Sequence, residues 1–291
     1  MLLHWFKFFP GDELRIFVHP DYILLTHLQR RLSAASKPQV MQQQVLSVDF
    51  SEPSHQCEAL KNCLTDAINS DRWQDIVKQG ISANIIISSH FVRYAVIPWS
   101  ADLAVESERQ AFMRYRFNAL FGDAVKTWDL RMDTPDFGQP SIASGIETKL
   151  IAVLYEVLTS ATIKVKRISP YLMLAINQSI NQIKQQNIQN FWLAVIESER
   201  LCFALIENGA WRLVKNVAAE NAISEQINTL IQREMVNANI SAILPLVFYQ
   251  ADSSADESIK MADFPTIQIH NLEGHVNSAK AFGNAWYAVR A

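Results

Sequence analysis

The fold of this chain is decided by the stretch Ala83–Met132, which opens with ANIIISSHFVRYAVIPW. The two apolar runs in this quotation, Asn84–Ile87 and Phe91–Ile97, predict two strands joined by a short turn, and a proline ends the second. A charged segment over 104–120 then predicts a helix, and 128–132 predicts a further strand. This order indicates a small subdomain inserted in a larger α/β protein.

The size and composition of the chain are those of a globular protein with a substantial core. The chain has 291 residues, of which 49% are hydrophobic and 19% are charged. This length suits one two-lobed α/β unit or two domains. A formal net charge of −3 argues against nucleic acid as a partner, because binding the phosphate backbone requires a basic face.

Cysteine usage and hydropathy indicate a cytoplasmic protein. Cys57, Cys63 and Cys202 form an odd, scattered set without metal spacing, which predicts reduced thiols. No apolar run reaches the roughly 18 residues that a membrane span needs. The apolar segment Leu2–Phe9 is read as an opening strand or packed arm, with contact to a membrane surface as the alternative.

The same succession of elements is predicted twice along the chain. The first half predicts a hairpin, Leu14–Val18 with Tyr22–Leu28, a third strand at Val45–Val48 and a helix over Cys57–Ile68. The Pro-, Gly- and Ser-rich stretch Thr134–Gly145 is predicted to be a loop or the boundary between two lobes.

The second half repeats the order of the first. Its predicted elements are a buried strand at Lys149–Leu154, a helix starting at Tyr155, a strand at Lys164–Ile168, a helix over Pro170–Ile183, a three-stranded meander over Phe191–Val214, a helix over Ile223–Asn237, strands at Ile243–Tyr249 and Thr266–His270, and a closing helix at Ala279–Val289. We therefore expect a duplicated α/β fold with mixed sheets. The expected lobes are 1–145, with an inserted subdomain at about 83–132, and 146–291.

No known catalytic or phosphate-binding signature occurs in the sequence. Phosphate loops need glycines that let backbone amides approach the anion, and the 8 glycines of this chain form neither a Walker nor a dinucleotide motif. H-E-x-x-H, paired C-x-x-C and G-x-S-x-G are also absent. The sequence predicts no catalytic residue, no cofactor and no metal site, and hence a protein that is not an enzyme.

Three polar turn positions have a functional and a structural interpretation. His90, after Ser88 and Ser89, is read as a turn residue rather than a base. Asp21 is read as a turn cap rather than a metal ligand. Glu197 and Glu199 flank a hairpin turn, where they are read as solvated charges rather than a cation site.

The order of elements resembles the actin-like fold of the type IV pilus assembly protein PilM and of the cytoplasmic domain of the type II secretion protein GspL. The resemblance is carried by the proline-terminated strand Arg93–Pro98 with its charged helix, by the meander Phe191–Val214, and by Ala281–Arg290, which is similar to the A-x-G-x-A-x-x-x-R closing helix of the family. It implies a two-lobed, ribonuclease H-like duplicated fold, a place in the cytoplasm at the inner face of the inner membrane, and docking of a peptide segment from a bitopic inner-membrane protein.

Two turns depart from the ATP-binding members of this fold, in which each phosphate hairpin has an Asp followed closely by Gly. The first turn here is Val18–Asp21 and contains Pro20, which removes an amide donor. The second is Ile196–Glu199, whose acidic side chains would repel phosphate. No ATP-site residue is therefore transferred to this chain.

The leading hypothesis is a nucleotide-free, actin-like scaffold (a pseudo-ATPase) for a bacterial pilus or type II secretion-like machine, acting through protein–protein interaction. The alternative is an actin-like ATPase or sugar-kinase-type enzyme with an atypical nucleotide site; a retained ATP switch is a third reading. For the partner we expect a groove or sheet edge in Ala83–Met132. Aromatic side chains are common interface anchors, and the candidates are Phe91, Tyr94, Trp99 and Phe112.

Overall fold

The computed structural model describes residues 12–29, 38–48, 56–101, 103, 105–133, 137–197, 199–250 and 264–270. Its elements in chain order are β1 Glu13–Val18, β2 Tyr22–Gln29, β3 Gln39–Ser47, α1 Gln56–Asn69, α2 Asp71–Lys78, β4 Ser82–Ile87, β5 Val92–Ile97, α3 Glu106–Phe121, the 3-10 helix η2 Gly122–Thr127, β6 Trp128–Met132, β7 Ser141–Glu147, α4 Thr148–Ser160, β8 Lys164–Pro170, α5 Tyr171–Gln185, β9 Phe191–Glu197, β10 Arg200–Glu207, β11 Ala210–Ala218, α6 Ile223–Ala238, β12 Leu246–Gln250 and β13 Thr266–His270. Within these ranges, no helix is long and apolar enough to cross a membrane.

The first sheet is mixed and has the strand order β3-β2-β1-β4-β8. β1 runs antiparallel to β2, and β2 antiparallel to β3, whereas β4 is parallel to both β1 and β8. All six residues of β1 are buried, as expected for a central strand with both faces covered. The predicted hairpin of β1 and β2 is confirmed.

The second sheet repeats this topology. Its order is β11-β10-β9-β12-β13, with two antiparallel pairings at one side and two parallel pairings at the other. β9 takes the central place that β1 has in the first sheet, and its seven residues are all buried. The predicted duplicated α/β fold with mixed sheets is confirmed, and so is the meander of β9, β10 and β11.

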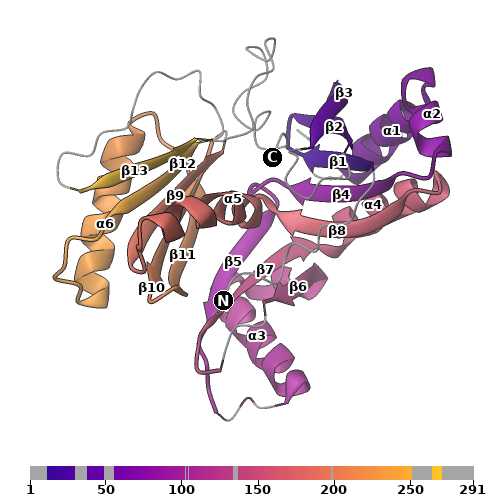
Figure 1. Ribbon diagram of the computed structural model, residues 1–291. Coiled ribbons are helices and arrows are strands. Elements are labelled where there is room, and N and C mark those ends of the chain that lie inside the picture. Colours follow the sequence, from indigo (N-terminus) through magenta and orange to yellow (C-terminus); the bar gives the residue numbers. More distant parts are fainter. Residues whose placement is uncertain are drawn as a thin grey trace.

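A smaller antiparallel sheet, β5-β7-β6, is not paired with these two sheets and has α3 beside it (Figure 1). Its separate core contains Ile97 of β5, Phe117 of α3 and Leu130 of β6. The inserted subdomain expected at about 83–132 stays a prediction, and the separate sheet and core begin at β5 rather than at Ala83. β4 is buried within the first sheet and does not pair with β5, so Ala83–Met132 is divided between two sheets.

Helix α5 lies between the two five-stranded sheets (Figure 1). Its buried residues Leu172 and Ile176 belong to the same core as Ile85 of β4 and Val195 of β9. A second core, between the other face of β9 and α6, contains Trp192, Phe203 and Ile231. The large shared core fixes how the two sheets approach each other, and so positions their turns.

Three predicted segments were wrong. Lys149–Leu154 is part of helix α4, not a strand, because its buried residues Leu150, Leu154 and Leu158 recur at helical spacing. Strand β3 begins at Gln39, before the strand predicted at Val45–Val48. Its glutamines suit an edge strand, where Gln43 Nε2 donates to Thr26 Oγ1 at 3.2 Å.

The third error concerns Ser141–Gly145, which was assigned to a loop but forms the central strand β7 of the inserted sheet. Small residues are required here by close packing. A Cβ atom added to Gly145 would lie 2.9 Å from Leu130 Cδ2 and from Trp128 Cε3. The glycine therefore marks a tight packing contact, not a turn.

Sheet membership does not change at residue 145. β7 runs through this position, and β8, which comes later, completes the first sheet. The division into 1–145 and 146–291 stays a prediction, and we propose a first lobe that extends through β8. The predicted segments Leu2–Phe9, Ala279–Val289 and Ala281–Arg290 lie outside the described residues.

Candidate functional site

Three turns from the two large sheets meet at the carboxyl ends of β1, β4 and β9. Parallel pairing places the last residues of β1 and β4, Val18 and Ile87, side by side, and Ser88 N–H donates to Val18 O at 3.0 Å. The turns that follow are thereby brought together, as expected where parallel strands end at one sheet edge. β9 reaches the same place from the second sheet. We name the side chains His19, His90 and Glu197 the interlobe cluster.

Glu197 connects the two sheets. It is the last residue of β9, and its side chain is only 1% exposed. Its Oε2 accepts a hydrogen bond from Ser89 N–H at 2.9 Å. The other oxygen, Oε1, has no hydrogen-bond partner among the described residues. A buried carboxylate oxygen without a donor is costly, so this atom needs an explanation.

His19 lies beside it from the first turn and is 1% exposed. Its ring stacks on Tyr22 at 4.6 Å between centroids and meets the ring of His90 edge-on at 5.0 Å. Burial lowers the pKa of His19 to about 4, with Glu197 opposing this shift and His90 adding to it, so the imidazole is neutral at pH 7. Nε2 of His19 has no partner among the described residues.

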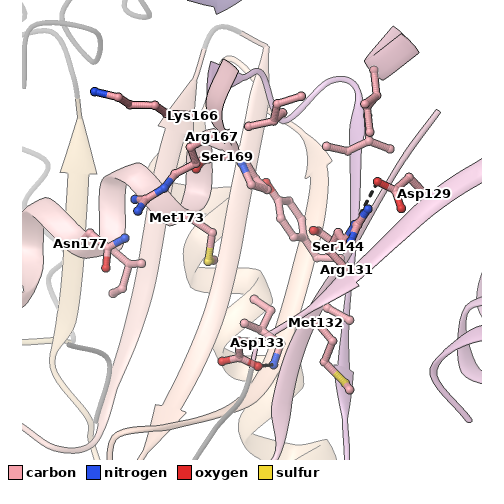
Figure 2. A pocket seen from close by; sticks show the side chains of 18 of the residues that line it. Asp129, Arg131, Met132, Asp133, Ser144, Lys166, Arg167, Ser169, Met173 and Asn177 are labelled. Carbon is pink, nitrogen blue, oxygen red and sulfur yellow. Dashed lines mark hydrogen bonds and ion pairs between the residues drawn. The ribbon is translucent and has the colours of Figure 1, made fainter. Parts of the chain in front are cut away.

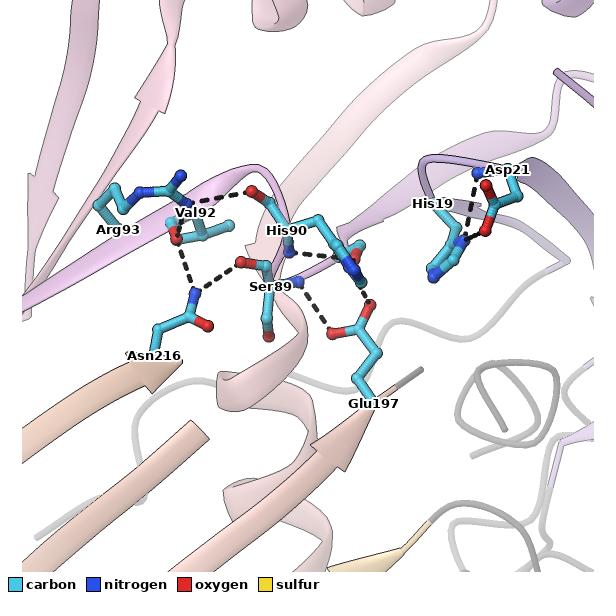
Figure 3. A network of polar contacts seen from close by, with 9 residues as sticks. His19, Asp21, Ser89, His90, Val92, Arg93, Glu197 and Asn216 are labelled. Atoms are coloured by element: carbon cyan, nitrogen blue, oxygen red, sulfur yellow. Dashed lines mark hydrogen bonds and ion pairs between the residues drawn. The ribbon is translucent and has the colours of Figure 1, made fainter. Parts of the chain in front are cut away.

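His90 and Asn216 complete the contacts between the lobes (Figure 3). His90 Nδ1 lies 2.9 Å from Ser88 Oγ and 3.9 Å from Glu197 Oε1. From β11, Asn216 Nδ2 donates to Ser89 O at 2.6 Å and to Val92 O at 2.9 Å. The turn between β4 and β5 is therefore held by the second sheet on both sides.

The structure corrects the expectation for Glu197 and adds contacts to those for His90 and Asp21. Glu197 is not a solvated charge, because β9 is central and carries its last side chain inside the protein. His90 does lie in a turn, as predicted, but faces His19 and Glu197. Asp21 is exposed at the rim, where its Oδ2 lies 3.4 Å from His19 Nδ1. Glu199 is exposed and takes no part.

A second feature is a cavity of about 480 Å³ between the inserted sheet and the first sheet (Figure 2). Its walls are the edge strands β6 and β8, with β7, α4 and α5 completing the lining. Met173 and Ile176 of α5 and Ile142 of β7 supply apolar surface. We call this cavity the edge groove, because β6 and β8 are edge strands of their sheets.

The polar rim of the edge groove contains both basic and acidic side chains. Arg131 Nε pairs with Asp129 Oδ2 at 3.0 Å, and Lys166 and Arg167 of β8 line the opposite wall (Figure 2). Asp133 accepts a hydrogen bond from Ile142 N–H at 2.8 Å. Burial raises the pKa of Asp133 to about 6, against the effect of this hydrogen bond.

The four predicted partner-binding aromatics do not form one surface. Tyr94 lines the edge groove but is 5% exposed, and Phe91 packs against the main core. Phe112 packs on the core of the inserted sheet and stacks with Tyr115. Trp99 contacts Phe137 at 4.9 Å between centroids, in a smaller cavity of about 280 Å³.

Two of these four aromatics, Tyr94 and Trp99, line cavities that adjoin each other. The smaller cavity and the edge groove share Met132 and Asp133 as lining residues. Phe137, which the sequence reading missed, is 90% exposed there. The signal that could have found it is an apolar side chain between Pro, Asp, Gly and Gln, in a stretch that was read only as a loop.

The arrangement of strands and helices is that of the actin-like ATPase fold. A Bacteroides thetaiotaomicron protein with this fold and unknown function is similar to the chain, with a TM-score of 0.59 and 14% identity over 89% of this chain and 91% of that one. No protein-family model matches the chain, and the search of curated proteins found no match either.

Two further structures are similar. The cytoplasmic domain of EpsL, an inner-membrane component of the type II secretion system of Vibrio cholerae, has a TM-score of 0.51 and 12% identity, with 82% of each chain covered. The PilM–PilN type IV pilus biogenesis complex matches with a TM-score of 0.50 and 12% identity, over 81% of this chain and 80% of that one. The expected likeness to these assembly proteins is confirmed at the level of the fold.

Proposed function

We propose that this chain is a nucleotide-free, actin-like scaffold of a pilus or type II secretion-like envelope machine, and that it docks a segment of an inner-membrane partner. In this proposal the protein lies in the cytoplasm at the inner face of the inner membrane and is not an enzyme. Its likeness to EpsL and to the PilM–PilN complex supports the class of machine.

The proposal that no nucleotide binds rests on the buried carboxylate of Glu197. This carboxylate lies where the turns Val18–Asp21 and Ile196–Glu199 meet. In ATP-binding members of the fold these turns hold phosphate. Here one turn contributes a carboxylate that accepts from Ser89 N–H, and the other contributes Pro20 and the buried His19. A phosphate group would meet a negative charge, in a place where the polar contacts are made by the protein itself.

The experiment is a thermal melt with and without magnesium and ATP. We expect no change in Tm, and the same result with ADP. A nucleotide at one hundred times its Kd would stabilise the fold by about 2.7 kcal/mol, which is a shift of several degrees. Such a shift with ATP and magnesium, but not with magnesium chloride alone, would favour the ATPase or sugar-kinase-type alternative.

The edge groove supports the docking part. An extended peptide can pair its main chain with the edge strand β6, and its side chains can reach Met173 and Ile142. Main-chain pairing tolerates changes in partner sequence. Trp99 and Phe137 extend the same surface beyond Met132, which places one predicted aromatic at its end.

The docking experiment uses a photocrosslinking amino acid in place of Phe137, in the native host. We expect crosslinks to a protein with a single membrane span, and a synthetic peptide of its cytoplasmic segment should bind the purified chain. The matched position is Tyr115, which is 67% exposed and lines neither cavity. Crosslinks of equal yield at Phe137 and Tyr115 would contradict docking of the partner in the edge groove.

A pair of variants then separates groove binding from stability. Met173→Glu should raise the Kd of the peptide at least about tenfold, because a charge replaces apolar surface in the groove. Met41→Glu is the control, since Met41 is 50% exposed on β3 and away from the groove. Equal affinity of the two folded variants would place the peptide elsewhere.

A further inference from the structure

The interlobe cluster has the composition of a transition-metal site. One potential ligand atom from each of His19, His90 and Glu197 lies within 4.8 Å of the other two. The three residues lie at the ends of three separate strands, so their convergence is a product of the fold and not of sequence proximity (Figure 3). Imidazole nitrogen and carboxylate oxygen are the ligands of many zinc sites.

Two buried atoms of this cluster lack partners, and each is a potential ligand. His19 Nε2 and Glu197 Oε1 have no hydrogen-bond partner among the described residues, and their side chains are only 2% and 1% exposed. Buried polar atoms are rarely left without a partner. A bound cation would satisfy both at once, whereas a hydrogen bond between them is not formed.

The surroundings of the two histidines orient them for such a role. Asp21 Oδ2 lies 3.4 Å from His19 Nδ1, and Ser88 Oγ lies 2.9 Å from His90 Nδ1. The backbone N–H of Asp21 also donates to His19 Nδ1 at 3.3 Å, so metal binding at Nε2 requires the other tautomer, in which the Nδ1 proton faces Asp21 Oδ2. For His19 this arrangement matches metal-binding histidines, whose other nitrogen is usually held by a carboxylate, carbonyl or similar group. His90 has its Nδ1 near both Ser88 Oγ and Glu197 Oε1.

The geometry points to a site for a divalent first-row transition metal ion, of which Zn²⁺ is the best fit, held by His19, His90 and Glu197. Two nitrogen ligands disfavour Mg²⁺ and Ca²⁺, which prefer oxygen. Ligand atoms in a tetrahedral zinc site are roughly 3.4 Å apart, so the side chains must close by about 1 Å on binding. Three protein ligands leave the fourth position for water.

Such an ion would join the lobes. His19 and His90 follow strands of the first sheet, and Glu197 ends the central strand of the second. The metal would therefore strengthen the contact that Glu197 already makes with Ser89. This inference does not rest on the docking proposal, and an ion held by these side chains is compatible with the lack of nucleotide.

The test is metal binding by tag-free, chelator-treated protein. We expect one equivalent of Zn²⁺ by calorimetry and by elemental analysis after dialysis, together with a rise in Tm. Co²⁺ should give visible absorption bands without the near-ultraviolet band of thiolate ligation. Mg²⁺ should neither bind stoichiometrically nor raise the Tm. The absence of stoichiometric Zn²⁺ and Co²⁺ binding would overturn the site, and a thiolate band would move the metal to Cys57 or Cys63 and overturn it too.

Variants assign the ligands. Glu197→Gln keeps a carbonyl oxygen for Ser89 N–H, and His90→Gln keeps a polar turn; each should weaken Zn²⁺ binding at least about tenfold. The control is His27→Gln, because His27 also pairs with a carboxylate, that of Asp12 at 3.1 Å, but lies outside the cluster. If one cluster variant does not fold, the other decides. Wild-type affinity in either folded variant would refute the assignment.

Discussion

Glu197 Oε2 accepts a hydrogen bond from Ser89 N–H across 108 positions of sequence, and both groups are buried. This contact connects the end of the central strand β9 in the second sheet with the turn that leaves β4 in the first sheet. A donor and an acceptor buried in this way must both be satisfied, so the contact depends on how the two sheets sit together.

We expect Glu197→Ala to lower the free energy of unfolding by about 1–3 kcal/mol, because the Ser89 amide would be left buried without an acceptor. Urea denaturation monitored by tryptophan fluorescence measures this. The matched control is Glu220→Ala, an exposed glutamate for which a change within about 0.5 kcal/mol is expected. Equal midpoints for the two variants would show that the Ser89 contact contributes nothing.

Asn216→Ala should loosen the same turn from its other side. Asn216 Nδ2 donates to Ser89 O and to Val92 O, so its removal leaves two carbonyl groups without this donor. We expect faster hydrogen exchange at the amides of Ser89 and Phe91, and a loss of about 1–2 kcal/mol. Asn69→Ala, at an exposed helix end, is the control. Unchanged exchange in this turn would contradict the prediction.

Asp133 should make stability fall as pH rises. The pKa of Asp133 in the folded protein is raised to about 6 from an ordinary value of 3.8, so folding favours its protonated form. The resulting stability is present below about pH 4 and is lost as the pH passes 6. Asp133→Asn should therefore stabilise the protein by about 1–2 kcal/mol at pH 7.5, after allowance for partial exposure, and by little at pH 4.

The measurement is the midpoint of urea unfolding at both pH values. Asp123→Asn serves as control, because the side chain of Asp123 is 84% exposed beside Lys126. A gain that is equal at both pH values would mean that the Asn acts through packing and not through charge.

Gly145→Ala should destabilise the inserted sheet. The new Cβ would lie 2.9 Å from both Leu130 and Trp128, and the Trp128 ring is rigid, so the strand pair β6 and β7 must move. Overpacking of this kind costs typically 1–3 kcal/mol. Ser144→Ala, the neighbouring position on the groove side, is the control. Equal Tm values for wild type and Gly145→Ala would show that the packing gives way easily.

The regular elements of the fold were largely predictable from local patterns. The alternation in Leu14–Val18 and the helical spacing in Ile223–Asn237 each match an element of the structure to within a residue. The errors came where a local pattern is ambiguous. The short apolar run Lys149–Leu154 is compatible with a strand or a helix, and only its packing against α1 and β8 selects the helix.

The candidate site was less predictable. His19 and His90 each follow a predicted strand, a position from which side chains can meet if the strands are parallel and adjacent. The sequence does not state which strands are neighbours. Glu197 was assigned to solvent, because a glutamate beside a hairpin turn is usually exposed. For the partner the sequence predicted a groove or sheet edge within Ala83–Met132, whereas most residues that line the edge groove lie outside that stretch.

The sequence by itself determined the two successions of strands and helices, the Pro20 and Glu197 departures from a phosphate-binding turn, and the likeness to actin-like assembly proteins. Only the tertiary structure decided that Val18 and Ile87 end side by side, that Glu197 is buried against Ser89, and that His19 and His90 face it. The physical reason is that helix and strand periodicity is set by neighbours in sequence. Burial and strand adjacency depend on the shared core around α5, which is assembled from residues far apart in the chain.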